Sequence, residues 1–306
     1  MNVLFRLDAG KKYGLGHLTR NIYLHHELIS RNFNTLFIIK TDNTKFIKDF
    51  LTKKNINIDV HFLNNKTSQE LDINSITKIS IINNIKIAII DHYNYNIKYL
   101  ESIKKNNLIL VNYDVNIKKN IVSDIILNPN IGFNIKDYNG TCRYDTRLCI
   151  GEKYLIINPK LKKKNSRESH KENILISFGG GTYPKKIFNL IDRITDNKKF
   201  NFIIISSDKK IIKITKRNTK VYFGDLNYNK IYSSLRFAIV SGGVTSQELA
   251  YLNIPMLIYP YVDNHKKTIT GLLKTNFALQ AKKEHLLNLD KFETHKLLPK
   301  IKIDNK

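Results

Sequence analysis

The first candidate for catalysis is a histidine that follows two closely spaced glycines near the start of the chain. The segment reads Gly14-Leu15-Gly16-His17, and a predicted helix begins at His17. Glycines let a backbone turn tightly and approach a ligand, and the positive end of a helix favours the neutral form of an imidazole. A neutral imidazole can take a proton from water, so His17 is the candidate general base. The spacing alone equally allows a plain glycine turn whose histidine bonds to a backbone group.

A second set of polar side chains follows an apolar run in the first half of the chain. Asp91, His92 and Tyr93 come directly after residues 86–90, which are typical of a buried strand. Ligands of parallel sheets bind at the carboxyl ends of the strands, so these three side chains are candidates for contact with a substrate. Taken alone, the pattern favours a structural interpretation, in which Asp91 caps the next helix and Tyr93 packs beneath the loop.

The second half of the chain contains two glycine-rich segments that each follow a predicted strand. The backbone of the first segment is expected to line the cleft, and the backbone N–H groups of the second, at the start of a helix, can bind a diphosphate without a metal ion. In this interpretation Glu248, one turn into the helix, accepts hydrogen bonds from both hydroxyls of a ribose; compensation of the helix dipole is the alternative. The candidate residues are Gly180 and Gly181 in the first segment, and Ser241, Gly242, Gly243, Thr245, Ser246 and Glu248 in the second.

Strands and helices alternate along the chain in an order that positions these loops. The apolar runs are continuous and rich in β-branched residues, which indicates parallel sheets covered on both faces. A polar run without periodicity, residues 158–172, separates two such series and is typical of a linker. We therefore predict an α/β protein with two Rossmann-like, doubly wound domains that face each other across a cleft: residues 1–157, and residues 173–306 with a helical tail. The predicted strands are residues 2–8, 35–40, 56–63, 86–91, 108–113, 173–177, 202–206, 221–223, 237–240 and 256–259, and the predicted helices of the first domain are residues 17–31, 45–54, 71–83 and 97–105.

The charge of the chain is strongly positive. Of 306 residues, 51 are Lys or Arg and 26 are Asp or Glu, which gives a formal net charge of +25. The basic residues are mostly lysines spread along the whole chain, so a compositional bias and a solvated surface explain them better than a nucleic-acid-binding face. Around the first glycine loop, however, we expect a basic cluster to attract a diphosphate: Arg6, Lys11, Lys12 and Arg20.

Composition and segment lengths exclude several classes of protein. Two cysteines and nine histidines without ligand spacing exclude a disulfide-stapled scaffold and predict no metal site. No segment approaches the roughly 18 consecutive apolar residues of a membrane span, and the first carboxylate, Asp8, comes too early for a signal peptide. We expect a soluble, cytoplasmic monomer that needs no cofactor, binds no nucleic acid and does not insert stably into a membrane.

Taken in chain order, the motifs resemble one family. They are Arg6-x-Asp8, Gly14-x-Gly16-His17-x-x-Arg20, Asp91-His92-Tyr93, Gly179-Gly180-Gly181, Ser241-Gly242-Gly243-x-Thr245-x-x-Glu248 and Asp263-Asn264. This set is similar to the nucleotide-sugar hydrolase of pseudaminic acid biosynthesis, a family related in fold to the GT-B glycosyltransferases. The resemblance covers residues 1–275, and the chain departs from the family at His265, where Gln is common.

The resemblance implies a reaction and a set of site residues. The reaction is release of UDP from UDP-2,4-diacetamido-2,4,6-trideoxy-β-L-altropyranose by attack of water at the anomeric carbon, with inversion and without a metal. His17 would position or deprotonate that water, Tyr93 and Asn264 would lie beside the sugar, and residues 242–248 would hold UDP. The remaining implied substrate-binding residues are Arg6, Asp8, Gly14, Gly16, Arg20, Asp91, His92, Gly180 and Gly181. Such an enzyme serves pseudaminic acid or surface-polysaccharide synthesis, including flagellin glycosylation in bacteria.

Three other functions stay open on the sequence. A GT-B glycosyltransferase would use the same nucleotide loop with an acceptor in place of water, although the basic helices 45–54 and 97–105 show no exposed apolar stripe for a membrane-bound acceptor. A non-catalytic protein could bind a nucleotide sugar without turnover. A nucleic-acid-binding protein would show steeply salt-dependent affinity.

Overall fold

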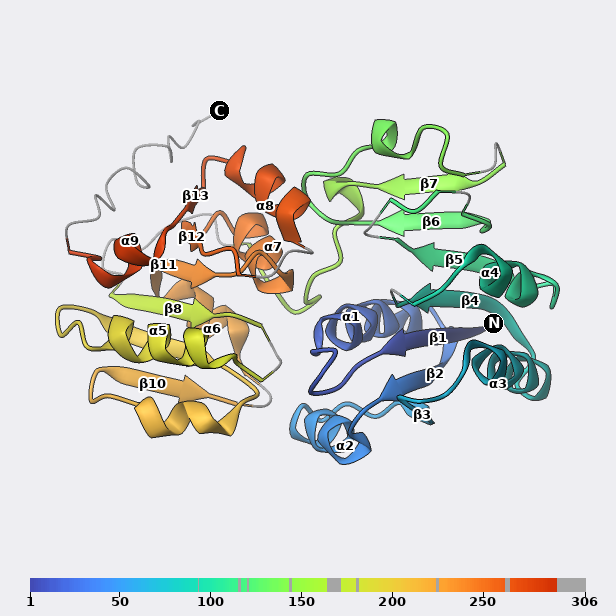
Figure 1. The fold of residues 1–306 in the computed structure, drawn as a ribbon, viewed down its shortest axis with the longest axis horizontal. Coiled ribbons are helices and arrows are strands. Elements are labelled where there is room, and N and C mark those ends of the chain that lie inside the picture. Colours follow the sequence, from blue (N-terminus) through green and yellow to red (C-terminus); the bar gives the residue numbers. More distant parts are fainter. Residues whose placement is uncertain are drawn as a thin grey trace. The chain divides into compact units, whose positions relative to one another are not determined.

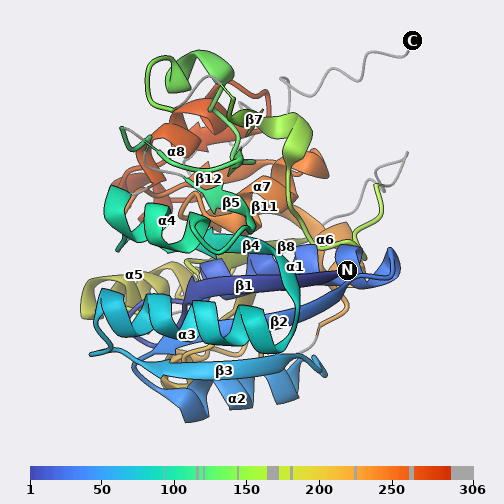
Figure 2. The same ribbon diagram turned by 90° about the vertical axis from the view of Figure 1, so that its right-hand side faces the viewer.

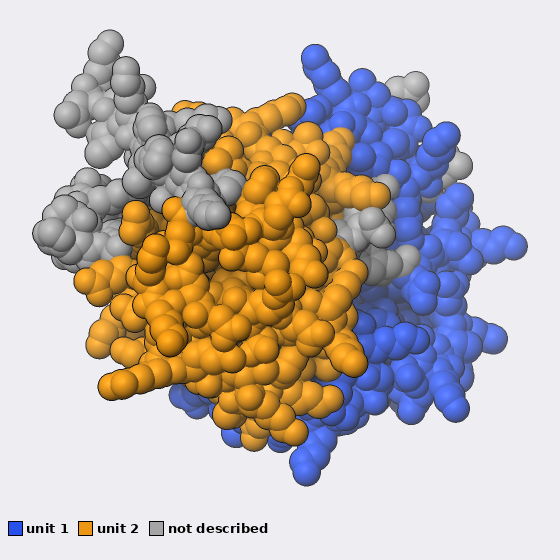
Figure 3. Space-filling view, turned by 60° about the vertical axis from the view of Figure 1, so that its left-hand side comes forward, with its two compact units in different colours: residues 1–159 blue, residues 160–306 orange. Residues whose placement is uncertain are grey.

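The structure is a computed structural model that describes residues 1–290 apart from residues 93, 115–116, 120, 143–144, 164–171, 180–181, 224–225 and 262–264. The chain divides into two compact units, residues 1–159 (unit 1) and residues 160–306 (unit 2), which are coloured separately in Figure 3. Most of the predicted linker 158–172, and the end of the predicted helical tail, lie outside the described residues.

Unit 1 is built on a parallel sheet of seven strands (Figure 1). Its strands are β1 (Asn2–Asp8), β2 (Asn34–Thr41), β3 (Asp59–Asn64), β4 (Ile85–Asp91), β5 (Ile109–Tyr113), β6 (Ile125–Asn128) and β7 (Arg147–Ile150). They lie in the order β3-β2-β1-β4-β5-β6-β7, and all neighbours are parallel. The winding of the chain therefore reverses between β1 and β4, which is where open α/β sheets bind ligands.

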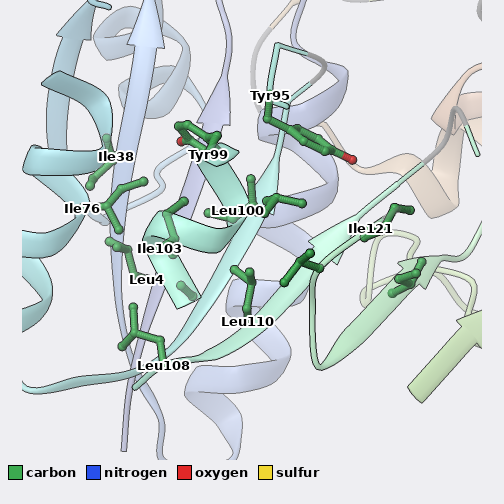
Figure 4. Close-up of a cluster of buried hydrophobic side chains, with 14 of the residues drawn as sticks. Leu4, Ile38, Ile76, Tyr95, Tyr99, Leu100, Ile103, Leu108, Leu110 and Ile121 are labelled. Atoms are coloured by element: carbon green, nitrogen blue, oxygen red, sulfur yellow. The ribbon is translucent and has the colours of Figure 1, made fainter. Parts of the chain in front are cut away.

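Helices cover both faces of this sheet (Figure 2). They are α1 (Gly16–Ser30), α2 (Thr44–Lys53), α3 (Gln69–Ile82) and α4 (Ile97–Lys104), with short 3-10 turns at Ile135–Tyr138 and Glu152–Tyr154. Successive side chains of a strand point to opposite faces, so Phe5 of β1 packs with α1 and α2 while Leu4 packs with α3 and α4. Figure 4 shows the second of these clusters, in which Tyr99, Leu100 and Ile103 of α4 face the sheet.

Unit 2 repeats this plan with six parallel strands. They are β8 (Asn173–Ser177), β9 (Asn201–Ile205), β10 (Thr219–Tyr222), β11 (Leu235–Val240), β12 (Met256–Ile258) and β13 (Ala278–Gln280), in the order β10-β9-β8-β11-β12-β13. The helices are α5 (Lys185–Thr195), α6 (Tyr228–Ser233), α7 (Val244–Tyr251), α8 (Lys266–Leu273) and α9 (Lys283–Leu287), with a 3-10 turn at Lys209–Ile214. Here the winding reverses between β8 and β11.

The predicted pair of doubly wound parallel sheets is confirmed. The predicted strands and helices match observed ones with ends shifted by a few residues, and the predicted strand 173–177 coincides with β8. Strands β6, β7 and β13, of three or four residues each, were not predicted, although the equally short β10 and β12 were. Within the described ranges, no helix has the length and apolarity needed to cross a membrane.

His25 of α1 is a buried histidine that packs away from the candidate catalytic residues. Its Nδ1 lies 2.7 Å from the hydroxyl oxygen of Thr35, and its ring stands edge-on to Phe37. Burial, and then the nearby His26, lower the pKa of His25 from 6.5 to about 4. The folded protein therefore keeps His25 neutral at pH values where the unfolded chain protonates it.

We predict that His25 makes unit 1 less stable in mild acid. Because its folded pKa lies below its unfolded value, the contribution to stability is complete above the unfolded pKa of 6.5 and is lost as the pH falls toward 4. Between about pH 7 and about pH 4.5, the wild type should lose about 1 kcal/mol more unfolding free energy than a His25→Gln variant. Urea denaturation at both pH values measures this difference, and equal losses in the two proteins would contradict it.

Candidate functional site

The loop between β1 and α1 folds back on itself and delivers His17 to the first turn of α1. Gly10 N–H donates to the Gly14 carbonyl over 3.1 Å, and Gly14 N–H donates back over 2.8 Å. A Cβ on Gly10 would lie 1.9 Å from a carboxylate oxygen of Asp42, so a larger residue there would have to displace that side chain. Gly14 has a φ of +78°, which also favours glycine. The glycines of the motif thus form a tight turn that ends at the helix.

His17 of this helix meets Asp91, the last residue of β4. Their Nδ1 and Oδ1 atoms lie 2.7 Å apart, and both side chains are buried, with exposed fractions of 8% and 1%. Burial alone would raise the pKa of Asp91, but the positive charge of Arg20 and the hydrogen bonds from His17 and Arg20 hold that pKa well below its ordinary value. Asp91 is therefore an anion at any physiological pH.

The ionised carboxylate decides which nitrogen of His17 carries the proton. An ionised oxygen can only accept, and two lone pairs facing each other over 2.7 Å would repel, so the proton lies on Nδ1. Arg20 Nη2 is also 2.9 Å from Nδ1, but it already donates to Asp91. With Nδ1–H directed to Asp91, the lone pair of the neutral ring is on Nε2. This is the arrangement in which a carboxylate orients a histidine base.

Two further residues of α1 bind the same carboxylate. Arg20 donates to both oxygens of Asp91, over 2.7 Å from Nε, and its guanidinium lies 3.7 Å above the ring of Tyr113 at the end of β5. Asn21 donates through Nδ2 to Asp91 and, over 2.8 Å, to the His17 carbonyl. Asn21 was not predicted, although its position four residues after His17 on a helix was an available signal. Asp91 thus accepts hydrogen bonds from three residues of α1, His17, Arg20 and Asn21, and fixes the first turns of this helix to β4.

Arg6 is buried on the opposite face of the sheet from α1 and forms ion pairs there. It shares the β1 face of Leu4, which packs against α3, and donates to Asp72 of α3 and, over 2.7 Å, to Asp8. With 1% of its surface exposed, Arg6 holds Asp8 at the end of β1, and its predicted contact with a substrate stays a prediction. Arg6 and Arg20 are both engaged with carboxylates, so of the basic cluster expected to attract a diphosphate only Lys11 and Lys12 are exposed.

The structure separates the roles of Asp91 and His92. The helix after β4 is capped by Asn96, which accepts from Tyr99 N–H over 2.9 Å, so the alternative in which Asp91 caps it is wrong. His92 is buried with its ring edge-on to Tyr95 and Tyr99, and its Nε2 lies 3.3 Å from the Tyr99 hydroxyl. Burial, and then the charge of Arg6, lower the pKa of His92 well below its ordinary value. His92 is thus a buried, neutral residue packed against two tyrosines, and its predicted contact with a substrate stays a prediction.

In unit 2, the predicted glycine loops follow β8 and β11, the two strands between which the winding reverses. Ser241, Gly242 and Gly243 join β11 to α7, and no side chain caps α7 at Gly243. In the first turn of α7, Ser246 N–H donates to the Gly243 carbonyl over 3.1 Å, and among the described residues Gly243 offers no side-chain cap, whereas Asn43 and Asn96 cap α2 and α4. The other predicted residues of these loops and of the sugar side, Tyr93, Gly180, Gly181 and Asn264, lie outside the described residues.

The polar residues of α7 differ in burial and in the hydrogen bonds that they form. Ser246 is fully buried and its hydroxyl donates to the Gly243 carbonyl over 2.6 Å, and its predicted contact with a nucleotide stays a prediction. Glu248 is buried and accepts from the Tyr232 hydroxyl over 2.8 Å, a partner that sequence spacing did not indicate. Thr245 is half-buried in the first turn and stays a candidate for a phosphate contact.

We predict that Gly242 cannot be replaced without loss of stability. Its φ is +94°, and a Cβ there would lie 2.6 Å from Cγ1 of Ile269 on α8. Gly242→Ala should lower the unfolding free energy by about 2 to 4 kcal/mol, from backbone strain and overpacking together. Gly179→Ala, at a φ of +100° with no described atom within 4 Å, is the matched control and should lose only the strain term. Equal losses in urea denaturation would contradict the role assigned to Ile269.

The paired doubly wound sheets, each with a loop at its point of reversal, place the protein in the GT-B fold class. Among solved structures, the calicheamicin glycosyltransferase CalG4 matches with a TM-score of 0.64 at 9% identity, over 97% of this chain and 89% of that one. UDP-GlcNAc 2-epimerase from Neisseria meningitidis, bound to UDP-GlcNAc, matches with a TM-score of 0.58 at 12% identity, over 98% and 94%.

One curated relative is similar over its whole length. It is the UDP-2,4-diacetamido-2,4,6-trideoxy-beta-L-altropyranose hydrolase of Campylobacter jejuni, 24% identical over 290 residues, which are 92% of this chain and 100% of the relative. No protein-family model matches the chain.

Proposed function

We propose that the protein is a nucleotide-sugar hydrolase that releases UDP from a UDP-diacetamido-trideoxyhexose without a metal ion. The observation that carries the proposal is the buried pair of His17 and Asp91 at the point where the winding of unit 1 reverses. The similarity to the Campylobacter hydrolase supports the same reaction, in pseudaminic acid or related surface-polysaccharide synthesis.

In the proposed reaction, His17 is the general base. Its Nε2 accepts a proton from water, and the water oxygen forms a bond to the anomeric carbon of the sugar. The bond from that carbon to the phosphate oxygen breaks, and its electron pair leaves with UDP. The products are UDP and a free sugar of inverted configuration, and His17 returns its proton to solvent. Asp91 stabilises the imidazolium that forms during the step.

We assign binding of the nucleotide to unit 2. The uncapped start of α7 and the Ser241–Gly243 loop offer backbone N–H groups to the diphosphate, and the half-buried Thr245 adds a hydroxyl. Gly242 permits close approach of the loop because it has no side chain. The structural neighbour with bound UDP-GlcNAc supports a uridine nucleotide as the ligand.

A GT-B glycosyltransferase is the second candidate, favoured by the likeness of the fold to CalG4. In a transferase, His17 would take the proton from an acceptor hydroxyl, and the same electron pair would leave with UDP. The two reactions share every residue described above and differ only in the nucleophile.

The nucleophile is tested by incubating the protein with a panel of UDP-diacetamido sugars in ¹⁸O-labelled water, without any acceptor. Mass spectrometry should find one ¹⁸O atom in the released sugar and none in UDP. Release that requires an added sugar or lipid acceptor would establish the transferase instead. Binding of the UDP-sugars without release of UDP from any of them would show a non-catalytic binding protein.

A further inference from the structure

A buried ion-pair network of three side chains connects α3 to the carboxyl end of β1. Arg6 Nε donates to Asp72 Oδ1 over 2.7 Å, and Arg6 Nη1 donates to Asp8 Oδ1 over 2.7 Å. The side chains of Asp72, Arg6 and Asp8 have exposed fractions of 3%, 1% and 10%. The network lies on the face of the sheet where Leu4 of β1 and Ile76 of α3, one turn after Asp72, share a cluster (Figure 4). Asp72 is therefore joined to the end of β1 through one guanidinium.

Asp72 fixes the plane of this guanidinium. Nε and Nη2 of Arg6 both donate to the Asp72 carboxylate, and such a bidentate contact sets the orientation of the planar group. Because the N–H groups of a guanidinium are held rigidly in one plane, the direction of Nη1 toward Asp8 is then set as well. Without Asp72, rotation about the long side chain of Arg6 would let Nη1 turn away from Asp8.

One oxygen of Asp8 is left to accept from another group. Arg6 donates to Oδ1, and Oδ2 accepts no hydrogen bond from any residue that the structure describes. Asp8 is the last residue of β1, and the residue before it, Leu7, pairs with Asp91 in the register with β4. Asp8 therefore offers an acceptor at the carboxyl edge of the sheet, where the winding reverses and one strand away from the carboxylate that binds His17.

The charge of the network selects the kind of group that Asp8 can accept. Two carboxylates and one guanidinium give the network a net charge of −1, whereas Asp91 and Arg20 on the other face of the sheet balance each other. A carboxylate oxygen accepts hydrogen bonds and repels anions, so Asp8 suits a hydroxyl or an amide N–H and does not suit a phosphate. Because the nucleotide is assigned to unit 2, the donor that reaches Asp8 belongs to the sugar.

We propose that Asp72 is a positioning residue for the sugar of the nucleotide sugar. It fixes Arg6, and Arg6 holds Asp8 so that Oδ2 accepts a hydrogen bond from a hydroxyl or an acetamido N–H of that sugar. The inference rests on the proposed function, because it takes a nucleotide sugar as the ligand and unit 2 as the site of UDP. Loss of this hydrogen bond weakens binding of the sugar nucleotide and leaves binding of UDP alone unchanged.

The test is calorimetric binding of two probes, UDP and UDP-2,4-diacetamido-2,4,6-trideoxy-β-L-altropyranose. Both are measured in a His17→Gln parent, because that replacement slows turnover during the titration. Adding Asp72→Asn turns an amide NH₂ group toward the N–H groups of Arg6 and breaks the bidentate contact. The sugar nucleotide should then bind about tenfold more weakly than to the parent, the usual effect of losing a hydrogen bond to a charged group, and UDP within about twofold. General damage to the fold would weaken both ligands together.

A double replacement shows whether Asp72 acts through Asp8. Asp8→Asn alone should cause the same selective loss, and combining it with Asp72→Asn should weaken binding by less than about a further twofold. Arg6→Lys keeps the buried positive charge but lacks the planar fork, so its selective loss tests the same contact if Asp72→Asn does not fold. Glu70→Gln, at an exposed carboxylate in the first turn of α3, is the matched control and should change neither affinity.

The outcomes separate this inference from the proposed function. Equal binding of the sugar nucleotide by the parent and by Asp72→Asn would overturn the role of Asp72, while release of UDP by the wild type would still support hydrolysis. Fully additive losses in the double replacement would overturn action through Asp8. A selective loss in Asp72→Asn, in a protein whose wild type releases no UDP, would support the positioning role and overturn hydrolysis alone. A folded wild type that does not bind the sugar nucleotide would overturn both.

Discussion

Replacing His17 with Gln is expected to lower kcat for UDP release by a factor on the order of 10² to 10⁴, the usual contribution of a general base. Glutamine cannot take a proton from water, but its amide can donate to Asp91 in place of Nδ1–H, so Asp91 keeps the number of its hydrogen bonds. KM for the UDP-sugar should change by less than about threefold, because the nucleotide is assigned to unit 2. Steady-state release of UDP measures both constants.

The control for this variant is His26→Gln. His26 is exposed on the same helix, and its replacement should leave kcat unchanged. A small external base such as imidazole should restore part of the rate in His17→Gly, because the absence of a side chain leaves room for the added base. Full activity in His17→Gln would remove the histidine from the mechanism.

Asp91→Asn is expected to damage both activity and stability. The amide places an NH₂ group where Asp91 now accepts from His17, Arg20 and Asn21, so donors face donors and the positive charge of Arg20 is left buried without a counterion. Breaking a buried ion pair in this way costs about 3 to 5 kcal/mol of unfolding free energy. An amide N–H facing Nδ1 also moves the lone pair of His17 from Nε2 to Nδ1, which should lower kcat on the order of 10² to 10⁴ even in the folded fraction.

The two effects are separable by experiment. Urea denaturation gives the stability loss, and ¹⁵N chemical shifts of the imidazole report which nitrogen is protonated. Glu27→Gln removes the carboxylate of an exposed ion pair with Arg31 on the same helix and should change stability by less than about 1 kcal/mol. An Asp91→Asn protein with the wild-type tautomer and wild-type kcat would refute the orienting role of Asp91.

The sheets and the positions of Asp8, Asp91 and the Ser241–Gly243 loop were predictable for one reason. A continuous β-branched run identifies a buried parallel strand, and a polar residue or glycine at its end identifies the carboxyl edge where ligands bind. The sequence could predict that the loops carrying His17 and Asp91 lie at the same edge of the sheet. It could not predict the hydrogen bond between them, because the number of residues between positions 17 and 91 gives no distance in space.

What the sequence could not supply were contacts between distant segments and the face on which a side chain lies. Arg6 was assigned to a substrate because of its motif, but alternation along β1 places it with Leu4 toward α3, where Asp72 binds it. Nothing in the local pattern links residues 6 and 72. Likewise, His92 follows Asp91 directly in the chain. Only the structure shows that His92 packs against Tyr95 and Tyr99, whereas Asp91 accepts hydrogen bonds from α1.

The close approach of Ile269 to Gly242 has an evolutionary consequence. A side chain at residue 242 and the branched side chain at residue 269 compete for the same volume, although the two positions belong to different elements. As related sequences diverge, a smaller residue at position 269 would relieve the crowding but not the backbone strain of a side chain at a φ of +94°. A larger residue at position 242 should therefore be rare, and where it occurs position 269 should already be smaller.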